Sequence, residues 1–194
     1  MSTYAKAETL VGVVAAPLDW TRSALLVVGF SLLTAAAAQV VVPLPFTPVP
    51  LTGQTFAVLL TGALLGPRLG ALAMLAYLLE GAAGLPFFRG GAAGVGQFSG
   101  ATAGYLLAFP AAAYVTGYLA ERGWDRRFLT AALAMALGSL VILACGWAWL
   151  ALLLKGGAAA FRLGVAPFLP GDLLKVALAA AALPSGWALL RRLK

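Results

Sequence analysis

Residues 54–79, QTFAVLLTGALLGPRLGALAMLAYLL, contain two apolar runs that are separated by the sequence GPRLG. Glycine and proline are strong turn formers, so the pattern predicts two short helices, 54–65 and 69–79, joined by a tight turn. Each run is shorter than the roughly 20 apolar residues of a usual membrane span. Short spans still fit a membrane when their ends reach the interface or the bilayer thins around the protein.

The rest of the chain has the same apolar character. Of its 194 residues, 62% are hydrophobic and 10% are charged, whereas about a quarter of the residues in a soluble domain are charged. Four further apolar segments lie at 23–42, 101–119, 128–154 and 171–190. We therefore predict an all-α integral membrane protein, a single lipid-embedded domain over residues 1–194 with six transmembrane helices.

Several classes of function are disfavoured by the residue types present. The chain has no histidine, which excludes histidine-based catalytic triads and histidine metal sites. Its one cysteine, Cys145, allows no intramolecular disulfide. The glycine-rich sequence GGAAGVGQFSG lacks the G-K-[ST] of a nucleotide-binding loop. We expect no catalytic residues, no metal site and no cofactor, and an intramembrane enzyme is disfavoured.

The positive charges predict how the chain is oriented in the membrane. Residues 1–20 lack the compact apolar core of a signal peptide, so the spans themselves are expected to direct insertion. The net charge is +7, but the basic residues sit at the ends of apolar runs, which is typical of membrane orientation rather than nucleic-acid binding. The termini and the second and fourth loops carry nine of them: Lys6, Arg22, Arg68, Arg122, Arg126, Arg127, Arg191, Arg192 and Lys194.

The first, third and fifth loops carry only Arg89, Lys155 and Arg162. The positive-inside rule then places both termini in the cytoplasm of a multi-pass protein of the bacterial cell (inner) membrane. The proline-rich loop VPLPFTPVP, the glycine-rich loop and the start of the last helix all lie on the outer side. These segments carry polar residues that predict an outward-facing pocket for a small polar solute: Gln54, Glu80, Arg89, Gln97, Asp172 and Lys175.

Each of these residues also has a simpler interpretation. Gln54 and Gln97 carry neutral amides that hydrogen-bond either a ligand or loop backbone. Asp172 follows Pro-Gly at a helix start and is expected to interact with free backbone amides, with Lys175 as its ion-pair partner. A lysine near a helix N-terminus faces the unfavourable end of the dipole, and a ligand that uses both groups removes this conflict. Arg89 is either an interfacial charge or a guanidinium group that binds a carboxylate. Glu80 is either a ligand residue or a solvated helix end.

Aromatic and small residues leave similar alternatives. Phe88 and Tyr105 are either walls of the pocket or part of the core. In the first span, two pairs of small residues stand four positions apart and favour close approach of another helix, either from a partner protein or from this bundle: Ser31 with Ala35, and Thr34 with Ala38.

Residues 38–91, together with SGATAGYLLAF at 99–109 and PGDLLK at 170–175, resemble BioY, the biotin-binding S component of energy-coupling factor (ECF) transporters. One departure is GATAGY in place of the usual GPTGGY. The resemblance implies the S-component fold and a subunit that captures biotin from the outer side. It also implies docking on a T component that is driven by two cytoplasmic ATPases.

The resemblance further assigns roles to individual residues. Asp172 and Lys175 would contact biotin, and Arg89 and Gln97 are candidates for its valerate carboxylate. The small residues of the first span would face the T component: Ser31, Thr34, Ala35 and Ala38. Two alternatives stay open, namely an S component for another vitamin and a scaffolding membrane protein whose polar residues only cap helices.

Overall fold

A computed structural model describes residues 9–15 and 19–193, so Lys6 and Lys194 of the charge count lie outside the described residues. The regular secondary structure of these residues is helical apart from a two-stranded hairpin, β1 (Val41–Val42) and β2 (Leu51–Thr52), in which Val41 pairs with Thr52. The helices are α1 (Leu10–Val14), α2 (Trp20–Ala38), α3 (Gln54–Ala82), α4 (Ala103–Ala120), α5 (Phe128–Leu154), α6 (Gly157–Gly164) and α7 (Leu169–Leu193).

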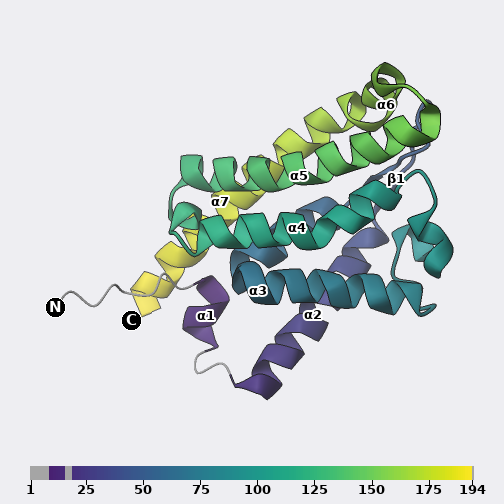
Figure 1. Ribbon diagram of the computed structural model, residues 1–194. Helices are drawn as coiled ribbons and strands as arrows, with labels where there is room; N and C mark the ends of the chain where they lie inside the picture. The colour runs from purple at the N-terminus through teal and green to yellow at the C-terminus, as the bar shows by residue number, and fades with distance from the viewer. Residues whose placement is uncertain (1–8, 16–18, 194) are drawn as a thin grey trace.

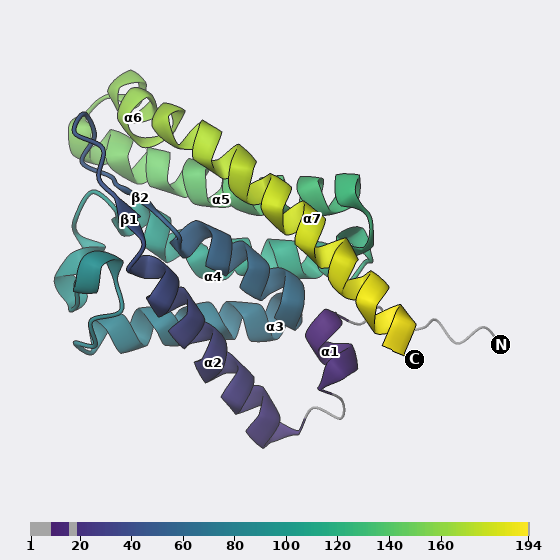
Figure 2. The same ribbon diagram turned by 180° about the vertical axis from the view of Figure 1, so that it is seen from behind.

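Helix α3 is a helical hairpin rather than one straight helix. Gly66 has φ 83° and ψ 178°. These backbone angles are not helical, and residues other than glycine rarely adopt them. Pro67 follows Gly66, so the chain turns within the predicted GPRLG sequence, and Figure 2 shows α3 folding back on itself. The two halves are in close contact, because a Cβ atom on Gly70 would lie 2.9 Å from the Cα atom of Gly62.

The predicted fold class, an all-α membrane protein with six transmembrane helices, is confirmed. Five helical segments of the described residues are long and apolar enough to cross a membrane, and the break in α3 divides one of them into two. Helix α2 ends at Ala38 rather than at residue 42, because the proline-rich segment begins the β hairpin there. The short helices α1 and α6 and the hairpin itself were not predicted from the sequence.

Small residues allow these helices to pack closely. A Cβ atom on Gly62 of α3 would collide with the backbone of Ala113 of α4. One on Gly104 of α4 would lie 2.6 Å from the carbonyl oxygen of Cys145 of α5. Helices in a bilayer gain little from hydrophobic burial against one another, so such close van der Waals contact is a main source of their association.

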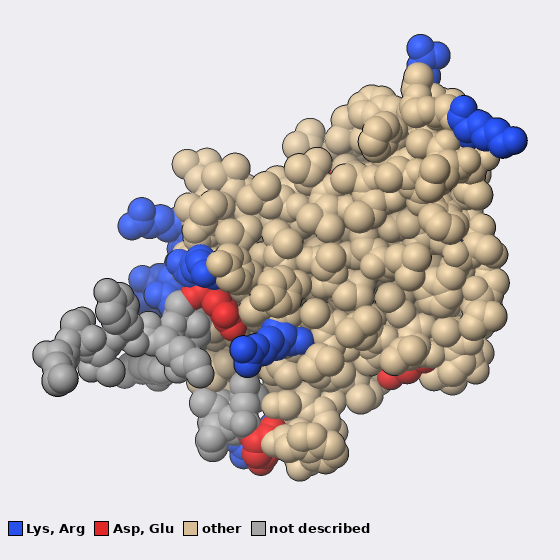
Figure 3. Space-filling view, viewed as in Figure 1, with Lys and Arg blue, Asp and Glu red and all other residues tan. Residues whose placement is uncertain are grey.

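The bundle has two distinct ends. The β hairpin, α6 and the loop between α3 and α4 lie together at one end, and α1 and the C-terminal end of α7 lie at the other (Figure 1). A broad surface without charged side chains separates charged groups at the two ends on the face that Figure 3 shows. That distribution is the one expected when the middle of the protein is surrounded by lipid.

Candidate functional site

A pocket of about 620 Å³, counting its open mouth, lies at the hairpin end of the bundle. Its walls come from the hairpin, the start of α3, the loop between α3 and α4, and the helices α4, α5 and α7. Seven of the eight residues that the sequence predicted as ligand-binding line the pocket: Gln54, Phe88, Arg89, Gln97, Tyr105, Asp172 and Lys175.

Asp172 and Lys175 lie one turn apart near the start of α7, with Lys175 Nζ 3.8 Å from Asp172 Oδ1. Their side chains are 13% and 19% exposed, so neither charge is simply solvated. Ser139 on α5 donates a hydrogen bond of 2.6 Å to Asp172 Oδ2. The carboxylate is therefore held from α5 on one side and by the ammonium group on the other.

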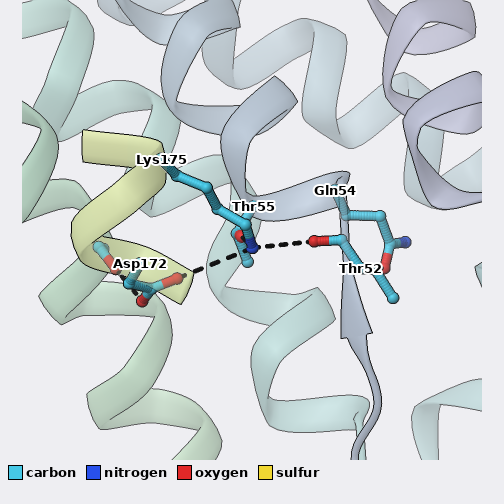
Figure 4. Close-up of polar contacts among 6 residues, drawn as sticks. Thr52, Gln54, Thr55, Asp172 and Lys175 are labelled. Atoms are coloured by element: carbon cyan, nitrogen blue, oxygen red, sulfur yellow. Dashed lines mark hydrogen bonds and ion pairs between the residues drawn. The ribbon is translucent and has the colours of Figure 1, made fainter. Parts of the chain in front are cut away.

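Lys175 connects α7 to the other side of the pocket. Its Nζ donates to the backbone oxygen of Thr52 at 2.9 Å and to Thr55 Oγ1 at 2.7 Å (Figure 4). These two hydrogen bonds use two of the three protons of the ammonium group, and Asp172, 3.8 Å away, is its ion-pair partner. The third proton forms no hydrogen bond among the described residues. The lysine thus joins the last helix to the end of β2 and the beginning of α3.

Gln54 begins α3 and is 5% exposed. Its Oε1 accepts from Thr52 Oγ1 at 3.0 Å, and its Nε2 donates to the hydroxyl group of Tyr77 at 2.5 Å. The helical hairpin at Gly66 is the reason that residues 23 positions apart meet. One N–H and one lone pair of the Gln54 amide remain for a ligand.

The loop between α3 and α4 covers one side of the pocket and contains two short 3₁₀ turns, Arg89–Gly91 and Val95–Phe98. Phe88 is 1% exposed, and its ring makes edge-to-face contacts with Tyr77 at 5.6 Å and with Phe98 at 5.7 Å between centroids. Arg89 and Gln97 therefore extend into the pocket lining from a loop that is anchored by an aromatic core.

The remaining walls are apolar. Tyr105 lines the pocket, but its hydroxyl group donates to the backbone oxygen of Gly164 at 2.7 Å. Its ring lies 6.3 Å from that of Phe168. The other apolar side chains of the lining include Leu106, Phe109, Ile142 and Leu143. One carboxylate, two cations and two amides thus stand against an apolar surface.

Glu80 is not among the residues that line this pocket. It is near the end of α3, where its Oε2 is buried without a hydrogen-bond partner among the described residues. The sequence could not separate Glu80 from the pocket residues, because its position at the end of a span is compatible with either side of the helix.

The small residues of α2 are packed inside this chain. Ser31, Thr34 and Ala38 are 0% exposed and Ala35 is 6% exposed, and Thr34 Oγ1 lies 3.9 Å from the sulfur atom of Met74 on α3. Of the two alternatives for these residues, the structure favours internal packing over contact with a partner helix. The exposed face of α2 carries large apolar residues instead, among them Leu25, Val28, Leu32 and Leu33.

Four residues that line the pocket or support its lining were missed by sequence reasoning: Thr52 and Thr55 in the lining, and Ser139 and Tyr77 behind it. A serine in the middle of the apolar segment 128–154 is a usable signal, because a buried hydroxyl group needs a partner. The two threonines and the tyrosine carry no such signal, since residues of these types also occur at many positions that are not functional.

The fold and the pocket define a class of protein, a multi-pass α-helical membrane protein with a polar binding pocket at one end of its bundle. The profile of the BioY family matches residues 5–192. The chain belongs to the BioY family.

Named relatives and one solved structure show the same relationship. The chain is 44% identical over 154 residues to the "Probable biotin transporter BioY" of Pyrococcus horikoshii, covering 79% of this chain and 89% of that protein. It is 37% identical over 146 residues to the "Biotin transporter BioY" of Rhizobium etli, covering 72% and 78%. The crystal structure of the "S-component for biotin from an ECF-type ABC transporter" superposes with a TM-score of 0.78 at 22% identity, covering 89% and 92%. This last similarity shows that the fold is shared.

Proposed function

We propose that this chain is the high-affinity biotin-binding transmembrane subunit, or S component, of an ECF-type vitamin importer. It is a transport protein and not an enzyme. The subunit captures biotin from the outer side of the cell membrane and docks on a T component driven by two ATPase subunits. Its single domain has both termini in the cytoplasm, and biotin is its transported ligand rather than a cofactor.

The chemistry of biotin matches that of the pocket. The ureido ring has two N–H donors and one carbonyl oxygen, the thiophane ring is apolar, and the tail ends in a carboxylate. Asp172 is an acceptor for an N–H group, Lys175 is a donor for the carbonyl oxygen, and Arg89 is a planar fork for the carboxylate. Gln97 is placed in the same lining and supplies a second polar contact.

The observation that carries this proposal is the buried Asp172–Lys175 pair in a pocket that also contains Arg89. Charged residues inside a membrane are costly and are usually functional. Asp172 is in the first turn of α7, where its charge interacts favourably with the helix dipole, but this does not account for Lys175, which faces the unfavourable end of the same dipole. A ligand that carries N–H donors, a carbonyl acceptor and a carboxylate uses all three charged groups, because these functions match Asp172, Lys175 and Arg89 in that order.

The test is titration of biotin into detergent-purified protein, wild type against Asp172→Asn. Truncating one member of a buried charge pair typically costs 2 kcal/mol or more, so we expect a loss of affinity of roughly 30-fold or greater. Asp19→Asn is the matched control, because Asp19 is an exposed N-cap of α2. That control is expected to bind biotin as the wild type does.

The alternatives give different results in the same experiment. If the wild type binds no biotin but does bind thiamin or riboflavin, the chain is an S component for another vitamin. If no vitamin binds, and Asp172→Asn and Lys175→Ala leave uptake unchanged in cells, the scaffolding alternative is correct. Binding of biotin methyl ester as strongly as biotin would contradict the role of Arg89.

A further inference from the structure

One continuous line of hydrogen bonds inside the protein joins the two segments that cover the pocket, the β hairpin and the loop between α3 and α4. Thr52 at the end of the β hairpin donates to Gln54, Gln54 donates to the hydroxyl group of Tyr77, and Tyr77 donates to the backbone oxygen of Phe87 at 3.1 Å. Phe87 lies in the loop 83–102 between α3 and α4. The line therefore runs from one cover of the pocket to the other.

This line lies in the core rather than at the pocket surface. Tyr77 is 0% exposed and is absent from the pocket lining, so it does not touch a ligand there. Its hydroxyl group both accepts and donates, which uses the two functions that a buried phenol must satisfy. Phe87 is two residues before Arg89, and its carbonyl oxygen is thereby held at a fixed distance from α3.

The line also begins at a residue that Lys175 contacts. The ammonium group donates to the backbone oxygen of Thr52, whose side chain makes the first hydrogen bond of the line. Other contacts also hold the loop. Gln39 Nε2 donates to the backbone oxygens of Pro86 at 3.5 Å and Phe88 at 3.4 Å, the Gly94 amide donates to the backbone oxygen of Gly81 at 2.8 Å, and Trp149 Nε1 donates to that of Gly100 at 2.9 Å. Among these, the Tyr77 contact connects the loop to the Lys175 side of the pocket.

We propose that Tyr77 is a positioning residue that holds Arg89 over the pocket and links the loop 83–102 to the Lys175 side of the site. The inference rests on the proposed function, since it takes biotin as the ligand. Loss of the Tyr77 hydroxyl group removes no atom of the pocket lining, although it also removes the hydrogen-bond partner of Gln54 Nε2. It weakens the hold on Phe87, so the loop opens more often and the ligand leaves faster.

The variant Tyr77→Phe removes only the hydroxyl group and keeps the ring against Phe88. One net hydrogen bond is worth 0.5–1.5 kcal/mol, so we expect biotin to dissociate roughly two- to tenfold faster. In ligand-free protein, hydrogen exchange at backbone amides of residues 85–98 should also become faster. Tyr105→Phe is the matched control for loss of a buried phenol, because its hydroxyl group bonds Gly164 and not the loop. We expect loop exchange in that variant to match the wild type.

A double-mutant cycle separates positioning from a merely structural role. If Tyr77 acts through Arg89, Tyr77→Phe should lower biotin affinity in the wild-type background and much less in the Arg89→Ala background. The same fold-change in both backgrounds would overturn the inference, as would wild-type loop exchange in Tyr77→Phe. If Tyr77→Phe does not purify as a folded protein, Gln54→Met removes the donor to Tyr77 and should also speed loop exchange.

Failure of this inference is distinguishable from failure of the proposed function. Absence of biotin binding by the wild type overturns the proposed function, whereas the exchange of the loop amides without ligand still tests the hold of Tyr77 on Phe87. Normal binding by the wild type combined with unchanged dissociation and exchange in Tyr77→Phe overturns the inference alone.

Discussion

Ser139 Oγ lies 2.6 Å from Asp172 Oδ2, and this hydrogen bond joins the middle of α5 to the start of α7 at the pocket. Ser139 is 6% exposed, so its hydroxyl group has little access to water. A neutral donor to a buried carboxylate fixes the direction of that carboxylate and lowers the cost of its burial. Ser139 is thus a supporting residue of the proposed biotin site.

Replacement of Ser139 by alanine should weaken biotin binding. A hydrogen bond to a charged group contributes about 1.5–3 kcal/mol, so we expect the affinity to fall roughly tenfold or more in a calorimetric titration. Ser185→Ala is the control, because Ser185 is on α7 and bonds only the backbone oxygen of Ala181. Equal affinities for Ser139→Ala and wild type would contradict this role.

Replacement of Lys175 by methionine should lower stability as well as binding. The change leaves Asp172 in a mostly buried position without its cation, and breaking one partner of a buried pair is strongly destabilising. We expect a lower Tm in detergent than for wild type. The double variant Asp172→Asn/Lys175→Met removes both charges and should recover part of the loss; a double variant less stable than Lys175→Met would disprove this coupling.

Replacement of Gly66 by alanine should destabilise the helical hairpin of α3. An alanine at this position would have to adopt φ 83°, and its Cβ atom would lie 2.8 Å from Glu121 Oε1. Such backbone strain costs on the order of 1–3 kcal/mol, which should lower the Tm by several degrees. Gly29→Ala on α2 is the matched control, since nothing lies within 4 Å of its added Cβ atom, and it should leave the Tm unchanged or slightly higher.

Asp125 should make the stability of the protein depend on pH. It lies in the turn between α4 and α5, 1% exposed, where burial raises the pKa of its carboxyl group above the ordinary value near 3.8. The hydrogen bond from Trp187 Nε1 at 2.6 Å and the charge of Arg126 lower the pKa but do not cancel the effect of burial. The carboxyl group therefore contributes stability below the unfolded-state pKa, and this contribution is lost as the pH rises through the raised folded-state pKa.

The variant Asp125→Asn keeps an acceptor for Trp187 but cannot ionise. The difference in Tm between Asp125→Asn and the wild type should shift in favour of Asp125→Asn as the pH rises from about 4 towards 8. The reason is that only the wild type must bury a charge at the higher pH. Thermal unfolding of both proteins across this range checks the sign. Asp19→Asn, at an exposed cap, should follow the wild-type curve. Parallel curves for Asp125→Asn and wild type would contradict the prediction.

Much of the fold follows from local patterns. Hydropathy and the GPRLG turn predicted the helical hairpin of α3, since a break needs only Gly66 and Pro67 to occur. The hairpin at 41–52 and the short helix α6 were missed, because proline-rich and glycine-rich segments specify a loop but not the partner that orders it. Thr47, for example, is fixed by a hydrogen bond to the backbone oxygen of Leu163, which lies 116 positions away.

The candidate site divides in the same way. Asp172, Lys175 and Arg89 were predicted because charges in an apolar chain are few and conspicuous. Glu80 satisfies the same criterion, but it lies outside the pocket lining, since the sequence does not state which side of α3 faces the ligand. Tyr77 was missed for the opposite reason, because a tyrosine in an apolar helix is ordinary until its hydroxyl group is seen between Gln54 and Phe87.

The sequence by itself determined the membrane class, the turn at Gly66, the resemblance to BioY and the charged residues of the pocket. These depend on hydropathy, turn chemistry and residue type, which act over a few neighbouring positions. Only the tertiary structure decided that Ser139 supports Asp172, that Lys175 reaches Thr52, and that the small residues of α2 are packed inside the chain. Those contacts join residues far apart in sequence, and they depend on how each helix is rotated and crossed against its neighbours.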